Sequence, residues 1–320
     1  MSSALVTGAY GLLGSWLVRA LLARGDRVTV LRRDRAVGSL LEVEGLESRC
    51  HVVYGDVADE ALMARVVAEQ EIDTIFHLAA QTIVGAAAVS PAGTFRTNIA
   101  GTWSVMEAAR QGGVRRVLVA SSDKAYGPAE RLPYTEEMPL RPTFPYDVSK
   151  ACTDLIARSY WHSYGVPVAV TRCANLYGGG DLNRSRLVPE LMAAVIEGRP
   201  PEIRSDGTPE RDFLYVEDAV EAYLALADAL DDERSGARGE AFNAGSGRPV
   251  SVRELVETVG KVAGVPLEVS YDPARATPGE IDRQYVDSSK LERVCGWRPR
   301  TSLEEGLRRT LDWYRANRVA

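Results

Sequence analysis

The chain has 320 residues, of which 45% are hydrophobic and 26% are charged, and its formal net charge is −6 at pH 7. It is long enough to bury a sizeable core in one large domain or two closely joined ones, and its negative charge argues against nucleic acid or a membrane surface as a partner. The four cysteines and three histidines show no metal-ligand or disulfide spacing, so we expect no metal site.

The beginning of the chain predicts a dinucleotide-binding turn. Residues 4–7 form a short apolar strand, Gly8, Gly11 and Gly14 follow at once, and residues 15–24 have the periodicity of a helix. A glycine turn between a strand and a helix lets backbone amides approach a pyrophosphate at the positive end of the helix. With a strand so close to the start and no apolar run near 18 residues, we expect no signal peptide and a cytoplasmic location.

The end of the second strand, residues 27–31, bears on the choice between NAD and NADP. An acidic residue at this position would bind the ribose of NAD. Arg32 and Arg33 stand there, with Asp34 behind them. Arginine could meet a 2′-phosphate, so NADP remains an alternative to NAD, and a solvated basic turn is a third reading. Residues 35–49 are expected to form a polar loop or a short helix.

The next strands place further groups at the same edge of the sheet. Strands are expected at 50–54 and 72–76, with a helix at 59–70 between them. Asp56 follows the third strand and could bond the adenine amino group or cap the helix. Small residues follow the fourth strand at 78–80, which lets the chain pass close to a cofactor. His77 is expected to pack beneath the site.

The segment from Ser121 to Lys150 carries the candidate chemistry. Ser122, Asp123 and Lys124 follow an apolar strand at 117–120, which is where open parallel sheets bind ligands. Tyr146 and Lys150 share a face of a predicted helix, and a lysine ammonium beside a phenol favours the phenolate. Simpler alternatives exist for each group. Tyr146 and Lys150 could be a pair on a helix surface, Ser122 and Asp123 could cap a turn, and Asp123 and Lys124 could form a plain surface ion pair. Asp123 and Lys124 are adjacent in sequence, so both can reach one substrate only if they lie in a turn.

Strands that alternate with helices predict a doubly wound parallel α/β sheet of the Rossmann type with a smaller α+β C-terminal substrate domain. We expect residues 1–174 plus 212–248 to bind the dinucleotide and residues 175–211 plus 249–320 to bind a sugar nucleotide. The remaining helices are expected at 95–111, 146–164, 187–198, 217–230, 251–263 and 302–317. The remaining strands are expected at 167–171, 241–243 and 267–270, with a loop at 175–180, a turn-rich segment at 203–209 and a charged loop at 231–239.

These motifs together resemble the extended short-chain dehydrogenase/reductase family of sugar-nucleotide epimerases and dehydratases. The resemblance spans the chain and rests on the three glycines, Tyr146 with Lys150, Arg172-x-x-Asn175-x-Tyr177-Gly178, Arg211-Asp212-Phe213 and Gly296-Trp297-x-Pro299. A narrower resemblance is to the CDP-glucose 4,6-dehydratases, through Gly14-Ser15-Trp16-Leu17, Ser122-Asp123-Lys124, and residues 178–182 with 186–189. Residues 203–208, Arg211-Asp212-Phe213 and Tyr126-Gly127 are more like those of epimerases.

The resemblance implies a function and roles for named residues. NAD, tightly bound and recycled, would be held by Gly8, Tyr10, Gly11, Leu12, Gly14, Arg32, Asp56, Val57, Leu78, Ala79, Ala80, Tyr146 and Lys150. The nucleotide-diphosphate sugar would be held by Asn98, Asn175, Arg186, Leu187, Val188, Arg211 and Arg283. The resemblance also implies a homodimer formed by the helices at 95–111 and 146–164. The apolar residues Leu155, Ile156, Tyr160 and Trp161 could form its interface, or they could simply pack on the sheet.

The implied reaction is a 4,6-dehydration, with CDP-glucose giving CDP-4-keto-6-deoxyglucose. Tyr146 would take the proton of the 4-hydroxyl as hydride leaves C4, with Ser122 bonded to the oxygen and Lys150 lowering the Tyr146 pKa. Asp123 would then protonate the leaving 6-hydroxyl, Lys124 would remove the C5 proton, and hydride would return to C6. A 4-epimerase, which needs no Asp-Lys pair, is the alternative. A non-catalytic dinucleotide sensor is a further one.

Overall fold

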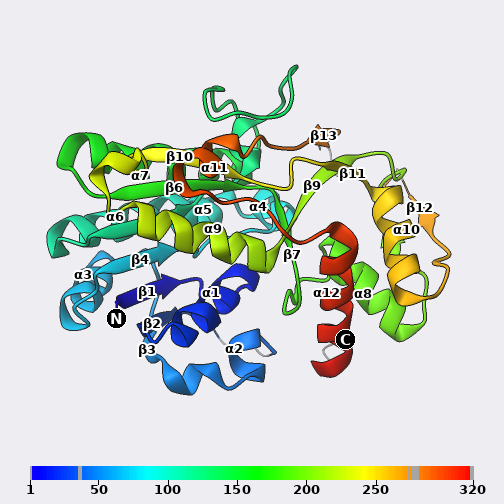
Figure 1. Cartoon of the computed structure of the whole chain (residues 1–320), viewed down its shortest axis with the longest axis horizontal. Coiled ribbons are helices and arrows are strands. Elements are labelled where there is room, and N and C mark those ends of the chain that lie inside the picture. The colour runs from blue at the N-terminus through cyan, green and yellow to red at the C-terminus, as the bar shows by residue number, and fades with distance from the viewer. Residues whose placement is uncertain (1, 35–37, 273, 275–280, 318–320) are drawn as a thin grey trace.

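A seven-stranded parallel sheet forms the centre of the computed structural model, which describes residues 2–34, 38–272, 274 and 281–317 (Figure 1). Its order is β3-β2-β1-β4-β5-β6-β10, so the chain starts in the middle and winds outward in both directions. The strands are β1 (Ser3–Thr7), β2 (Arg27–Arg32), β3 (His51–Tyr54), β4 (Thr74–His77), β5 (Arg116–Ala120), β6 (Val168–Cys173) and β10 (Glu240–Ala244). The predicted Rossmann-type fold is confirmed, with the strand order reversing between β1 and β4.

Helices cover both faces because the strand side chains alternate and are apolar on both sides. Val6 and Phe76 point into one core and Leu5 and Ile75 into the other. The first core is covered by α1 (Leu12–Ala23), α2 (Leu40–Val43), α9 (Val216–Ala229) and α11 (Ser289–Cys295). The second is covered by α3 (Glu60–Glu69), α6 (Gly101–Gly112) and α7 (Pro145–Tyr164). Such double coverage is what near-continuous hydrophobic strands require.

The C-terminal elements gather beyond one end of the sheet (Figure 1). β7 (Asn175–Tyr177), β9 (Glu210–Tyr215), β11 (Pro249–Ser251) and β13 (Arg283–Gln284) form a small sheet, and β8 (Glu202–Ile203) pairs with β12 (Ser270–Tyr271). The helices of this region are α8 (Leu187–Glu197), α10 (Val252–Ala263) and α12 (Leu303–Asn317). The boundaries of two domains remain a prediction.

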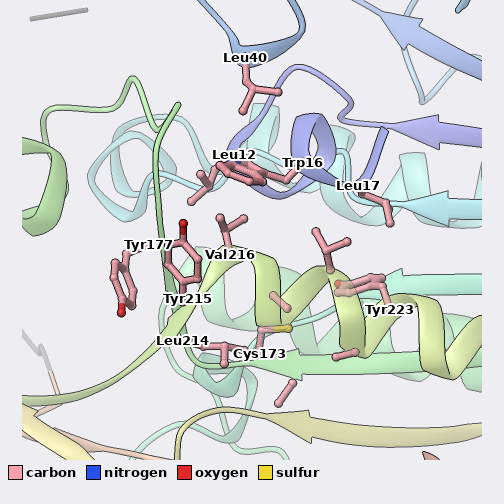
Figure 2. Close-up of a cluster of buried hydrophobic side chains, with 14 of the residues drawn as sticks. Leu12, Trp16, Leu17, Leu40, Cys173, Tyr177, Leu214, Tyr215, Val216 and Tyr223 are labelled. Carbon is pink, nitrogen blue, oxygen red and sulfur yellow. The ribbon is translucent and has the colours of Figure 1, made fainter. Parts of the chain in front are cut away.

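One hydrophobic cluster joins the two regions, as Figure 2 shows. Leu12 and Trp16 of α1 face Val216 and Tyr215 at the start of α9. The Trp16 indole also donates a hydrogen bond of 2.8 Å to the carbonyl oxygen of Gly179. The glycine turn and the C-terminal region are therefore packed on a shared core.

Several predicted elements need correction. The helix at 95–111 is broken into α5 (Pro91–Phe95), a π-helical turn η2 (Arg96–Ala100) and α6. The predicted loop at 175–180 begins with β7, and the predicted strand at 267–270 is reduced to β12. Additional short elements are α4 (Val84–Val89) and the 3-10 turns η1 (Leu46–Arg49), η3 (Asp123–Tyr126) and η4 (Glu233–Ser235). Ser251 Oγ accepts from the Glu254 amide at 3.1 Å and so caps α10.

No helix within the described residues is both long and apolar enough to cross a membrane. In the same residues, no group of three or more histidine, cysteine, aspartate or glutamate side chains could hold a metal ion.

Candidate active site

A cavity of about 270 Å³ lies at the carboxyl ends of β1 to β4. It is lined by Gly8, Tyr10, Gly11, Leu31, Arg33, Asp34, Val57, Ala79, Ala80 and Thr97. A Cβ on Gly14 would lie 2.1 Å from the Gly8 carbonyl oxygen, whereas one on Gly11 would meet that oxygen at an ordinary 3.4 Å. A glycine is thus required at position 14 for packing within the protein. At position 11, which lines the cavity, the missing side chain leaves room for a ligand. This cradle fits a dinucleotide, whose pyrophosphate would lie against the glycine turn and α1.

At the end of β2, Arg33 and Asp34 line the cavity and Arg32 does not, which revises the role predicted for Arg32. The Arg32 guanidinium bonds the Glu47 carboxylate at 2.8 Å and lies over the rings of Tyr10 and Tyr54. It is therefore already paired. Asp34, which lines the cavity and accepts from Arg33 Nε at 2.6 Å, is the carboxylate there that could also accept from a ribose hydroxyl.

Other predicted cofactor residues divide into two groups. Val57, Ala79 and Ala80 line the cavity as predicted, while Leu12 is buried in the core as the first residue of α1. Asp56 accepts from the Ala58 amide at 2.9 Å, and the cap of α3 is Asp59. The alternative of Asp56 as that cap is wrong.

The turn required by the Asp-Lys pair is present as η3, directly after β5. Ser122 Oγ accepts from the Lys124 amide at 3.2 Å and donates to Asp123 Oδ1 at 3.1 Å. This local bonding folds the segment back, so the two side chains no longer diverge as they would in an extended strand.

Asp123 is a buried carboxyl with one unpaired oxygen. Asp123 is 2% exposed, and its Oδ2 has no hydrogen-bond partner among the described residues. Burial raises the pKa of Asp123, against the lowering influence of Lys124 and of the Ser122 hydrogen bond. A protonated carboxyl at this position could donate from the unpaired oxygen.

Lys124 is held by a residue that the sequence analysis missed. Its Nζ donates to Gln284 Oε1 at 3.1 Å, and Gln284 comes from β13, far along the chain. The alternative of a plain surface ion pair does not describe this geometry, because Asp123 is buried and bonds Ser122.

Tyr146 and Lys150 are both buried on the first turns of α7. Burial raises the pKa of Tyr146 to about 12, while Arg186 and a hydrogen bond with Ser122 lower it. Lys150 Nζ donates to the Ala120 carbonyl oxygen at 2.8 Å, and burial lowers the pKa of Lys150 to about 8. The predicted lowering of the Tyr146 pKa by Lys150 is thus not seen, and Arg186 is the cation that acts most on this phenol.

Asp147 is a second carboxyl of the site that the sequence analysis overlooked. Burial raises its pKa to about 6, Lys124 lowers it and Asp123 raises it. It follows Tyr146 in the first turn of the helix, where acidic residues are common, so the sequence alone does not single it out.

The predicted substrate residues do not all reach one place. Arg186 bonds Asp181 Oδ2 at 2.9 Å and Thr82 Oγ1 at 2.8 Å, and so joins the loop after β4 to the start of α8. Leu187 and Val188 follow it in α8. Arg211 lies near Asp123, whose pKa it lowers.

Three other assignments fit less well. Asn98 is 1% exposed, and its amide bonds the Gln81 backbone and Ser149 Oγ, so a direct substrate contact is not supported. Asn175 Nδ2 donates to the Asp212 carbonyl oxygen at 3.4 Å. Arg283 pairs with Glu210 at 2.5 Å on the surface.

His77 lies beneath the site, as predicted. Its ring nitrogens bond Thr7 Oγ1 at 2.9 Å and Thr102 Oγ1 at 3.1 Å. Burial, together with the nearby charge of Lys150, lowers its pKa to about 3. The ring is therefore neutral and structural.

Comparison with known proteins agrees with this site. Residues 5–310 match the family described as GDP-mannose 4,6 dehydratase. The chain belongs to this family. A dTDP-glucose 4,6-dehydratase from Streptomyces antibioticus is 35% identical, over 98% of this chain and 93% of the relative.

Two solved structures extend the comparison. The UDP-glucose 4-epimerase of Thermotoga maritima with UDP-glucose has a TM-score of 0.89 and 30% identity, over 98% of this chain and 99% of the other. The dTDP-glucose 4,6-dehydratase of Streptomyces venezuelae with NAD has a TM-score of 0.86 and 32% identity, over 99% and 98%.

These comparisons confirm that the chain is an enzyme of the sugar-nucleotide dehydratase and epimerase class, and NAD-bound relatives confirm the cofactor predicted for the family. The narrower resemblance to CDP-glucose dehydratases is not supported by them. The sensor alternative is correspondingly weakened.

Proposed function

We propose that this enzyme is an NAD-dependent 4,6-dehydratase of a nucleotide-diphosphate hexose. The observation that carries the proposal is Asp123, a buried carboxyl with a raised pKa and an unpaired oxygen. A 4-epimerase has no step that needs such an acid. CDP-glucose is the first candidate substrate, on the Ser122-Asp123-Lys124 sequence, and dTDP-glucose is the second, because dTDP-glucose dehydratases are among the relatives.

The chain's own groups divide the reaction between them. NAD, when bound, supplies the acceptor for hydride from C4 and its later return to C6. Tyr146 takes the proton of the 4-hydroxyl, Ser122 bonds that oxygen, and the cationic Arg186 opposes the burial that raises the Tyr146 pKa. The resulting 4-ketone acidifies the C5 proton.

Elimination then uses the two groups of η3. Lys124 takes the proton from C5, and Asp123 gives its proton to the leaving 6-hydroxyl, so one water is lost across C5 and C6. Each such general acid or base typically contributes about 10² to 10⁴-fold in rate. As hydride returns to C6, Lys124 gives its proton back to C5, and the proton that Tyr146 took from the 4-hydroxyl balances the one that Asp123 gave to the leaving water.

The quaternary proposal is a homodimer through α6 and α7. Trp103 of α6 is 43% exposed and Leu155 of α7 is 58% exposed, so both helices present a large apolar side chain to the surface that a partner subunit could cover. Trp161, in contrast, packs against the second core, which agrees with the alternative that this residue packs on the sheet.

A 4-epimerase remains the second candidate, because the UDP-glucose 4-epimerase of Thermotoga maritima matches nearly the whole fold. The test is incubation with CDP-, dTDP-, UDP- and GDP-hexoses, followed by mass spectrometry. Loss of one water from any of them supports the dehydratase. An unchanged mass together with a new sugar isomer would instead establish an epimerase.

A further inference from the structure

The contact between Lys124 and Gln284 links η3 to a residue 160 positions later in the chain. Gln284 is 0% exposed. Its amide oxygen accepts from Lys124 Nζ at 3.1 Å, so the one flexible cation on η3 has a fixed partner. A lysine side chain otherwise has four rotatable bonds and samples many positions.

The backbone around Gln284 is held on two sides. On one side, Gln284 is in register with Arg211 of β9 in a parallel pair. On the other, the Tyr134 amide donates to the Tyr285 carbonyl oxygen at 3.0 Å, and the Asp287 amide donates to Tyr134 at 2.9 Å. The acceptor for Lys124 is therefore built into the sheet and not carried on a loose loop.

A neutral acceptor suits a lysine that must act as a base. An amide oxygen can accept from an amine or an ammonium without adding charge, whereas a carboxylate would favour the ammonium. The charged and titratable groups around the pair are Asp123 beside Lys124, Asp147 from α7, Arg211 from β9 and the phenol of Tyr134.

We propose that Gln284 is a positioning residue that aims the Lys124 nitrogen at C5 of the hexose, and so determines how efficiently the oxidised sugar loses water. The inference rests on the proposed dehydratase function. It makes Gln284 necessary for the elimination and dispensable for oxidation at C4, which uses Tyr146 and Ser122.

The test compares Gln284→Met, which keeps the length but loses the acceptor, with Gln284→Glu, which keeps an acceptor and adds charge. Gln111→Met, an exposed residue of α6, is the matched control. Oxidation at C4 is followed by nicotinamide absorbance, and proton removal at C5 is followed by deuterium incorporation from solvent. Water loss is measured by mass.

We expect Gln284→Met to slow C5 exchange and water loss about tenfold, the size of one hydrogen bond, with C4 oxidation unchanged. Gln284→Glu should keep C5 exchange but move its pH dependence upward by about one unit, because the carboxylate favours the ammonium. In a Lys124→Met background, Gln284→Met should have no further effect.

The outcomes are distinguishable. A parent enzyme that releases no water overturns the proposed function itself. The positioning role is overturned if Gln284→Met releases water at the parental rate. It is also overturned if Gln284→Met slows C4 oxidation and C5 exchange equally. If Gln284→Met does not fold, an unchanged pH profile in Gln284→Glu overturns it as well.

Discussion

Asp123 and Asp147 bring two buried carboxyl groups to the same lysine from different elements, one from η3 and one from the first turn of α7. Lys124 lowers the pKa of both, and Asp123 raises that of Asp147. Burial is nevertheless the largest influence on each and outweighs the lysine. The site therefore contains two carboxyls that are easier to protonate than ordinary ones.

Asp147 should make folding stability depend on pH. Its folded-state pKa of about 6 lies above the usual 3.8, so its contribution is fully present below about pH 4 and is lost as the pH rises through about 6. We expect Asp147→Asn, which stays neutral, to raise the free energy of unfolding by up to about 3 kcal/mol at pH 7. Urea unfolding of both proteins at several pH values measures the difference. If the difference in free energy of unfolding between the two proteins does not grow from pH 4 to pH 7, this role of Asp147 is contradicted.

The glycine turn offers a matched pair of substitutions. Purified enzyme should contain oxidised NAD, which is released on denaturation, because the reaction returns its own hydride. Gly11→Ala should lose bound NAD while its melting temperature matches that of the parent stripped of NAD, since its Cβ meets only ordinary contacts in the protein. Gly14→Ala should lose bound NAD and also have a lowered melting temperature, because its Cβ overlaps the Gly8 carbonyl. Equal melting temperatures for the two variants would refute this distinction.

The ion pair of Arg172 and Asp154 behind the site should matter for stability. Both side chains are almost fully buried, and two nitrogens of Arg172 bond the Asp154 carboxylate at 2.8 and 3.1 Å. Removing one partner of a buried pair leaves an uncompensated charge, so we expect Asp154→Asn to cost about 3 to 5 kcal/mol in denaturant unfolding. Glu107→Gln, which breaks the exposed pair with Arg110, is the control and should have little effect.

The sheet could be predicted because most of its strands are short apolar runs, and those of the first half, β1 to β4, alternate with segments of helical periodicity. The cluster at Ser122 and Tyr146 could be predicted because parallel strands end at one edge. Gln284 could not, since a two-residue strand has no periodicity and its pairing with β9 is long-range. The pairing of Arg32 with Glu47 could not be predicted either, because the sequence does not show that Glu47 reaches it.

Tyr146 should be required for chemistry and not for binding. The residue is 8% exposed, and its hydroxyl is the group bonded with Ser122. We expect Tyr146→Phe to slow C4 oxidation by about 10²-fold or more, while calorimetric binding of the sugar nucleotide is nearly unchanged. Tyr164→Phe, at the exposed end of the same helix, is the control. Near-normal turnover in Tyr146→Phe would rule out the assignment.

Asp123→Asn and Lys124→Met separate the dehydratase from the epimerase. Asparagine keeps the shape of Asp123 but cannot donate as a carboxylic acid, and methionine keeps much of the length of Lys124 without a basic nitrogen. Oxidation at C4 needs neither group, so nicotinamide absorbance should still change in both variants. We expect water loss to fall by about 10²-fold or more in each.

Exchange of the C5 hydrogen assigns the two roles. Deuterium incorporation should fall most in Lys124→Met, because the base removes that proton, and less in Asp123→Asn, where the missing group is the acid for the leaving hydroxyl. If both variants release water at the parental rate, Asp123 and Lys124 form a structural pair. If the parent only inverts C4, neither residue has an elimination to catalyse, and the buried carboxyl of Asp123 must serve to bind the hexose.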